Sequence, residues 1–181
     1  MDSNLTEIQS DYARFLPAVS GFYATFIGKQ RFDEYVEYNR VPKHFANGVE
    51  SLNFLDPKAQ IHYKWCLYSA GHAALDLNKD APGEDMFRNR DRSTSWCLGD
   101  SGGFQIGKGV WEGDWKDPNC PKAQKKREQV LAWMDAYMDY GMILDIPAWV
   151  SRSPAGQKAT GITNYQDAVN ATRINLSLIH I

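Results

Sequence analysis

The chain has 181 residues, which is enough for one domain or for part of one. Hydrophobic residues make up 43% and charged residues 23%, an ordinary balance for a soluble globular protein, and no apolar run reaches membrane-spanning length. The formal net charge of −2 excludes the overall basic excess that is typical of nucleic-acid-binding domains, although it leaves room for a local basic face.

The cysteines indicate a reducing environment. Cys66, Cys97 and Cys120 are odd in number and far apart, and the absence of a Cys-x-x-Cys pair excludes a zinc finger or a dithiol redox motif. The first residues are acidic and polar, unlike a secretion signal. We therefore expect a cytoplasmic protein that does not associate with a membrane.

Apolar spacing predicts helices and strands that alternate along the chain. In chain order we expect a helix over residues 4–15, a strand over 18–27, a helix over 32–40, strands over 61–69 and 95–98, a helix over 121–140, a strand over 142–144 and a helix over 164–176. The polar stretches 78–92, 107–119 and 151–161 are expected to be loops. Strands separated by helices predict an α/β fold with a parallel sheet.

The helix over 121–140 is the clearest of these elements. Pro121 stands in its first turn, where proline is tolerated, and Gly141 is the expected stop. Its expected apolar stripe consists of Val130, Leu131, Met134, Tyr137 and Met138. For the last helix, Thr163 and Gln166 match a capping box.

Two acidic residues, Asp100 and Asp145, each follow a short apolar strand. Because the carboxyl ends of parallel strands meet at one edge of a sheet, we expect both side chains in one crevice. The residues that follow the first acid are Ser101, Gly102, Gly103, Phe104 and Gln105. Glycines allow a ligand close to the backbone, the ring offers a flat apolar face, and the amide offers a donor and an acceptor. The pattern predicts a site for a planar, polar heterocycle.

Other interpretations of this segment stay open. Aspartate often caps helices or closes loops, which would explain either acid alone. The segment Gly99–Gly103 also fits the signatures of serine hydrolases, with Ser101 as nucleophile and His72 as a candidate base. His72 lies too close in sequence for the chymotrypsin type, and His180 is the only histidine that follows the serine, as an α/β-hydrolase would require.

A basic run lies at the start of the predicted helix over 121–140. Lys122, Lys125, Lys126 and Arg127 form either a solvated helix face or a set of phosphate contacts. In the preceding loop, Trp111 and Trp115 either pack over the strand ends or stack on a nucleobase. His44 and His62 are expected to be structural, and the histidines and cysteines form no cluster with metal-ligand spacing.

The segments Asp100–Gln105 and Leu144–Pro147, with a helix between them, resemble the tRNA-guanine transglycosylases and their DNA-acting relatives. Those enzymes insert 7-deazaguanine bases into nucleic acid. The second segment is similar to the archaeal and DNA-modifying branches, whereas residues 1–90 resemble the family only loosely.

The resemblance implies a TIM (β/α)₈ barrel and an exchange of guanine in DNA or tRNA for a 7-deazaguanine base. It implies that Asp100 is the general acid/base, that Phe104 stacks on the base, and that Asp145 accepts hydrogen bonds from its guanine-like edge. It also implies that the pocket is shaped by Ser101, Gly102 and Gly103. Gln105 would contact the substrate. The chemistry agrees, because a guanine edge presents two donors to a carboxylate and glycosidic cleavage needs a proton carrier.

A (β/α)₈ barrel takes about 250 residues. We therefore expect residues 1–175 to be the N-terminal part of such a barrel, inactive alone, and residues 176–181 to be a non-native tail. We expect no cofactor in this segment; by the resemblance, the aspartate nucleophile and a zinc site lie later in the barrel. The expected partners are a 7-deazaguanine base and a nucleic acid, with a homo-oligomer left open. The alternative from another class is a catalytically inactive base-binding partner subunit.

Overall fold

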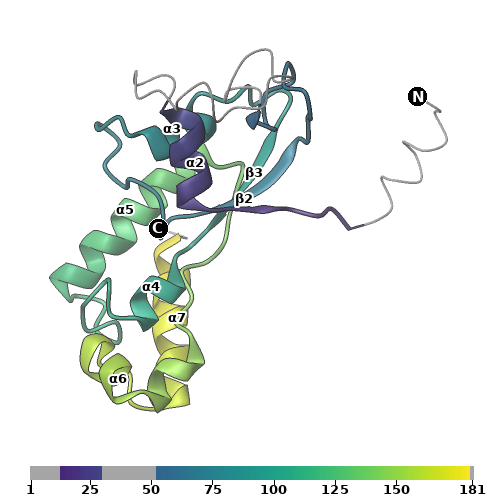
Figure 1. The fold of residues 1–181 in the computed structure, drawn as a ribbon. Coiled ribbons are helices and arrows are strands. Elements are labelled where there is room, and N and C mark those ends of the chain that lie inside the picture. Colours follow the sequence, from purple (N-terminus) through teal and green to yellow (C-terminus); the bar gives the residue numbers. More distant parts are fainter. Residues whose placement is uncertain (1–12, 30–51, 180–181) are drawn as a thin grey trace.

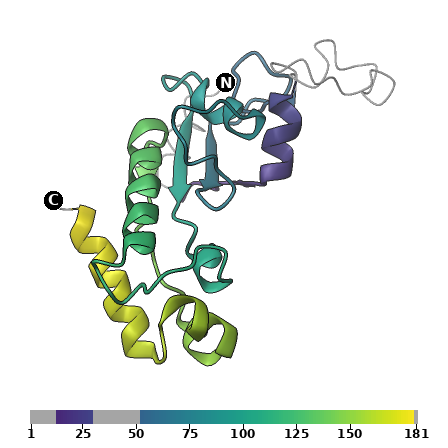
Figure 2. The same ribbon diagram turned by 90° about the vertical axis from the view of Figure 1, so that its left-hand side faces the viewer.

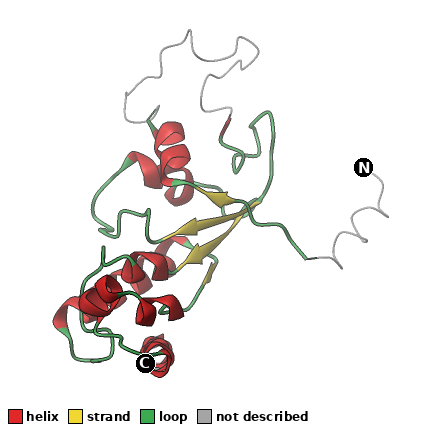
Figure 3. Ribbon diagram, turned by 60° about the horizontal axis from the view of Figure 1, so that its bottom comes forward, coloured by secondary structure: helices red, strands yellow, loops and turns green. Residues whose placement is uncertain are grey.

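A computed structural model, which describes residues 13–29 and 52–179, contains a parallel sheet with helices along one side of it (Figure 1). The sheet has four strands in the order β1-β2-β3-β4, and each neighbouring pair is parallel (Figure 3). The strands are β1 (Ala18–Val19), β2 (Trp65–Ser69), β3 (Trp96–Asp100) and β4 (Tyr140–Gly141). The predicted α/β class with a parallel sheet is confirmed.

Helices follow the strands along the chain. They are α2 (Gly21–Gly28), α3 (Pro82–Arg88), α4 (Gly103–Gly107), α5 (Pro121–Tyr137), the 3₁₀ helix η3 (Ala148–Arg152), α6 (Pro154–Thr160) and α7 (Tyr165–Ile179). In Figure 2, α5 lies beside the strands, and α6 and α7 lie at the end of the molecule away from α2. None of the helices within the described ranges has the length and apolar character needed to cross a membrane.

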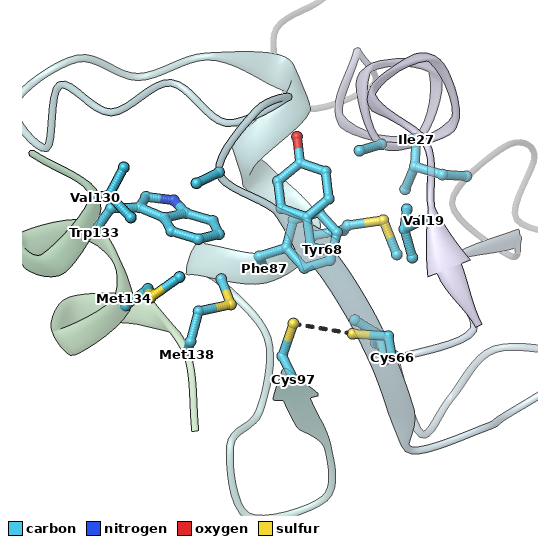
Figure 4. Close-up of a cluster of buried hydrophobic side chains, with 14 residues drawn as sticks. Val19, Ile27, Cys66, Tyr68, Phe87, Cys97, Val130, Trp133, Met134 and Met138 are labelled. Atoms are coloured by element: carbon cyan, nitrogen blue, oxygen red, sulfur yellow. Dashed lines mark hydrogen bonds between the residues drawn. The ribbon is translucent and has the colours of Figure 1, made fainter. Parts of the chain in front are cut away.

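One face of the sheet packs against helices. Cys66, Tyr68 and Cys97 point from β2 and β3 into a core that also contains side chains of α2, α3 and α5 (Figure 4). The Tyr68 and Phe87 rings stack with centroids 3.8 Å apart. The strands alternate between buried and less buried residues, as expected for a sheet covered on one side.

The opposite face stays outside both core clusters and is half-buried or exposed. We call it the open face; its residues include Trp65, Leu67, Trp96, Leu98, Asp100 and Tyr140. Trp65 stacks on Trp96 at 5.7 Å, and Trp96 stacks on Tyr140 at 5.8 Å. The open face therefore carries an aromatic row, and Asp100 lies on it at the carboxyl end of β3.

A second core holds the part of the chain that follows β3. Ile106 of α4, the loop residue Trp115 and Ala168 of α7 meet there with segments from both sides of η3. Trp115 and Trp133 are fully buried, whereas Trp149 is 40% exposed. The tryptophans therefore contribute both to the core and to the surface.

The predicted strand over 18–27 is wrong beyond its first two residues, because α2 begins at Gly21. The Ser20 hydroxyl accepts a hydrogen bond from the Tyr23 N–H at 3.1 Å and caps this helix. Packing of α2 against the core overrides the β-propensity of its aromatic and branched residues.

Two predicted loops contain helices. The stretch 78–92 forms α3, which has Pro82 in its first turn and two acidic residues near its N-terminus. Buried Glu84 accepts hydrogen bonds from Trp133 Nε1 at 3.0 Å and from the Ala74 N–H at 2.9 Å, so tertiary contacts stabilise this short helix. The stretch 151–161 contains α6, which is capped by Ser153 and ended by Gly161 at φ 72°.

Several other helices and strands begin or end at residues that differ from the predicted ones. The helix predicted over 121–140 ends at Tyr137 because Met138 turns to extended backbone and leads into β4. The predicted strand over 142–144 is wrong, because pairing with β3 ends at Gly141 and the residues after it are irregular. For α7, Asn164 accepts from the Asp167 N–H at 2.9 Å, so the cap is this pair and not Thr163 with Gln166. The helix also includes residues 176–179, part of the expected tail. Residues 13–17 are not helical, and residues 4–12 and 32–40 lie outside the described ranges.

A buried carboxylate ties β4 to β3. Asp139 accepts hydrogen bonds from the Cys97 N–H at 2.7 Å, from Arg90 at 2.6 Å and from Arg92 at 2.9 Å. Burial alone would raise the pKa of Asp139, but these donors outweigh it and hold the pKa below its ordinary value. The charged carboxylate therefore stabilises the fold.

This contribution is expected to depend on pH. It is present above the ordinary aspartate pKa of about 4 and is lost as the pH falls through the lowered pKa of the folded state. Replacing Asp139 by asparagine is expected to cost about 1–2 kcal/mol at pH 7 and to flatten the fall in stability below pH 4. Urea unfolding across this pH range tests the prediction, with the exposed Glu128→Gln as control. An unchanged acid limb in the Asp139 variant would contradict it.

Candidate functional site

Asp100 ends β3 and stands on the open face of the sheet. Its carbonyl accepts a hydrogen bond from the Ala70 N–H at 2.9 Å, which fixes its backbone against the chain leaving β2. Among the described residues, nothing hydrogen-bonds to its half-buried carboxylate. Asp100 therefore does not act as a helix cap or loop closure in this part of the chain, and its acid group stays available.

A hydrogen bond joins the two predicted motifs. Ser101, which is completely buried, donates from its hydroxyl to Asp145 Oδ1 at 3.1 Å. The segment of Asp145 is held on both sides, because the Met142 N–H donates to the Gly99 carbonyl at 2.8 Å and the Ile146 N–H donates to Thr172 Oγ1 at 2.9 Å. The structure thus brings the exposed residue Asp145 to the carboxyl edge of the sheet, where β3 ends in Asp100.

Two glycines make this close approach feasible. Gly102 has φ 80°, and a Cβ there would lie 2.6 Å from the Trp111 ring. A Cβ at Gly103 would lie 2.5 Å from the Asp145 carbonyl oxygen and 2.7 Å from its Oδ1. Any side chain at Gly103 would therefore displace the carboxylate, which explains why the sequence needs glycine here.

Gln105 packs its amide group against the backbone that follows β2. A Cβ on Gly71 would lie 2.1 Å from the Gln105 Cδ atom. The Gln105 Oε1 atom is buried and has no hydrogen-bond partner among the described residues. A buried acceptor without a donor is costly, so this amide is held in the wall of the site at a cost in stability.

An exposed aromatic pair lies beside these polar groups. Phe104 on α4 is 58% exposed, and its ring centroid is 6.2 Å from that of Trp149 on η3. Lys108 Nζ lies 5.4 Å from the Phe104 centroid and 5.8 Å from the Trp149 centroid. Sequence reasoning missed Trp149, although its position four residues after Asp145 was a usable signal.

The serine-hydrolase alternative is not supported by this geometry. The Ser101 hydroxyl donates to a carboxylate, and full burial keeps it from an external substrate. His72 is exposed, and no hydrogen bond between His72 and Ser101 is present among the described residues.

The basic run divides into two parts. Lys122 and Lys125 are exposed and Lys126 is half-buried, but Arg127 is only 2% exposed. Arg127 donates to Asn175 Oδ1 at 2.7 Å and to the Trp115 carbonyl at 3.0 Å, so it stabilises the second core. Both interpretations of the run, a solvated helix face and a set of phosphate contacts, are therefore wrong for Arg127.

The structure also places the tryptophan and histidine candidates from the sequence. Trp115 is buried in the second core, whereas Trp111 packs over Gly102. His62 is exposed, and His44 lies outside the described ranges. Within residues 13–29 and 52–179, no group of three or more His, Cys, Asp or Glu side chains is arranged to hold a metal ion.

Comparisons with protein-family models, with curated proteins and with solved structures found no match.

Proposed function

We propose that this chain belongs to a base-exchanging glycosyltransferase, which replaces guanine in a nucleic acid by a 7-deazaguanine base. The observation that carries the proposal is the hydrogen bond between Ser101 and Asp145, because it joins the two motifs on which the family resemblance depends. Both motifs lie at the carboxyl edge of a parallel sheet, where catalytic residues gather in α/β folds.

We further propose that the sheet is part of a (β/α)₈ barrel. Its strands follow one another in sequence order, and one face carries the helix-covered core while the other lies outside both clusters. A doubly wound sheet would reverse its strand order and cover both faces. Consecutive order with one covered face supports the barrel, in which the open face would become the interior.

Asp145 is suited to read a guanine-like edge. Ser101 occupies one position on Oδ1, and the remaining lone pairs of the exposed carboxylate can accept from the N1–H and the 2-amino group of the base. Phe104 offers an exposed ring face for stacking. Together these groups recognise a planar heterocycle that has two adjacent donors.

Asp100 carries the proton in this proposal. In the first half-reaction a carboxylate nucleophile attacks C1′, the C1′–N9 bond breaks, and Asp100 gives a proton to the departing guanine. In the second, Asp100 takes the N9 proton of the incoming base, a new C1′–N9 bond forms and the nucleophile departs. The resemblance implies that the nucleophile is an aspartate on a later strand, and no residue of this site is assigned that role.

Label transfer tests the reaction. The protein expressed from its complete reading frame is incubated with radiolabelled guanine and either tRNA or duplex DNA. We expect label to enter one of the polymers, and we expect Asp100→Asn to slow incorporation by about 10²–10⁴-fold because the proton carrier is lost. The variant should keep its affinity for the free base. Label that enters neither polymer, or equal rates for the variant and the parent, would refute the proposal.

A further inference from the structure

Five lysines surround two adjoining hollows next to the candidate site. One hollow has a volume of about 500 Å³ and the other about 810 Å³, and both are lined by Gly109, Glu112 and Lys122. We call them together the lysine groove; its lysines are Lys108, Lys122, Lys125, Lys126 and Lys158. The residues that line the groove come from the loop after α4, the start of α5 and α6, and these segments can be followed in Figure 1.

The positive charge of the groove is a local feature. Its lining contains two carboxylates, Glu112 and Asp114, against the five lysines, whereas the whole chain has a formal net charge of −2. Glu112 lies 3.7 Å from Lys122, but both side chains are largely exposed, so solvent screens this pair. The groove therefore presents excess positive charge to an incoming anion.

The walls of the groove are held in place by the backbone. The Gly113 N–H donates to the Ala159 carbonyl at 3.1 Å, and the Trp115 N–H donates to the Thr160 carbonyl at 3.0 Å. Buried Trp115 anchors the same loop in the second core. The lysines therefore project from a preformed surface, so that a ligand need not order the backbone on binding.

One lysine is held close to an aromatic ring. Lys126 Nζ lies 5.0 Å from the Trp111 ring centroid. Burial and the neighbouring charge of Lys125 lower the pKa of Lys126. A bound anion would offset the repulsion between Lys125 and Lys126.

The groove continues into the candidate site. Lys108 lines the larger hollow and also lies over the rings of Phe104 and Trp149. A polyanion in the groove would therefore pass beside the ring proposed to stack on the base.

This inference rests on the proposed function. We propose that the lysine groove binds the phosphodiester backbone of the nucleic acid whose base enters the site. Lysines act as point charges, so a row of them contacts successive phosphates without reading sequence. Both tRNA and duplex DNA supply this chemistry.

Fluorescence anisotropy with labelled tRNA and labelled duplex DNA, at several salt concentrations, tests the proposal on the 181-residue chain. The variant Lys122→Ala/Lys125→Ala removes two exposed groove lysines, and Lys58→Ala/Lys79→Ala removes two exposed lysines elsewhere as the matched control. We expect the groove variant to bind at least tenfold more weakly at about 0.1 M salt and to reduce the salt slope by about two. The control should match the parent.

Binding to tRNA alone or to DNA alone would support the groove and identify the source of the phosphates. Equal losses in both variants, or no preference of the parent for nucleic acid over polyglutamate, would overturn the proposal. Affinity for the free 7-deazaguanine base is measured in the same preparations. If the parent chain binds nucleic acid through the groove but does not bind the free base, the result would count against the proposed function and still support the groove.

Discussion

Replacement of Arg127 by methionine is expected to lower the free energy of unfolding by about 2–4 kcal/mol, because it leaves several buried oxygen acceptors without their donor. The guanidinium is 2% exposed and donates to Asn175 Oδ1 and to the Trp115 carbonyl. Burial lowers the pKa of Arg127, which reflects the cost of keeping it charged inside the protein. Methionine keeps most of the aliphatic stem but leaves those oxygen atoms buried without donors.

Urea unfolding measures the effect, with the exposed Arg152→Met as the matched control. A loss of this size is a large fraction of the stability of an ordinary domain, so the variant should unfold at a much lower midpoint. An unchanged midpoint combined with weaker nucleic-acid binding would instead assign Arg127 to phosphate contact.

The sequence predicted the sheet better than the helices that cover it. The apolar strand that ends in Asp100 is a local signal, and the parallel order followed from the helices between the strands. The apolar segment before Asp145 misled, because β4 ends at Gly141. Gly21–Gly28 reads as a strand because of its branched and aromatic residues, yet Ser20 caps it and the core selects a helix. For α3 the start signals were present in Pro82 and in the acids that follow, but its buried partner Trp133 lies far away in sequence.

Some features of the candidate site could likewise be predicted from the sequence, and others could not. Convergence of the two motifs could be anticipated, because topology alone brings strand ends together. The contact of Gln105 with Gly71 and the placement of Trp149 beside Phe104 join segments with no common pattern. The role of Arg127 was hidden for a related reason: one run of basic residues follows the helix surface, and only packing decides which member turns inward.

Replacement of Asp145 by asparagine is expected to weaken binding of a 7-deazaguanine base by about 100-fold, which corresponds to the loss of one or two charge-assisted hydrogen bonds. The asparagine oxygen can still accept from the Ser101 hydroxyl, as Oδ1 does now. Its amide group would then point a donor at the two donors of the base. The fold should be preserved while recognition is lost. Isothermal titration of the free base into the 181-residue chain measures the effect.

A second ligand separates edge recognition from a general loss of shape. A 7-deaza base without the 2-amino group should bind the parent more weakly than the guanine-like base, because one acceptor position of Asp145 is left unfilled. The asparagine variant should bind the two bases with nearly equal affinity. Asp135→Asn on the exposed surface of α5 is the matched control and should behave like the parent. If the variant still distinguishes the two bases as the parent does, Asp145 does not read the amino group, and the hydrogen bond from Ser101 only closes a loop.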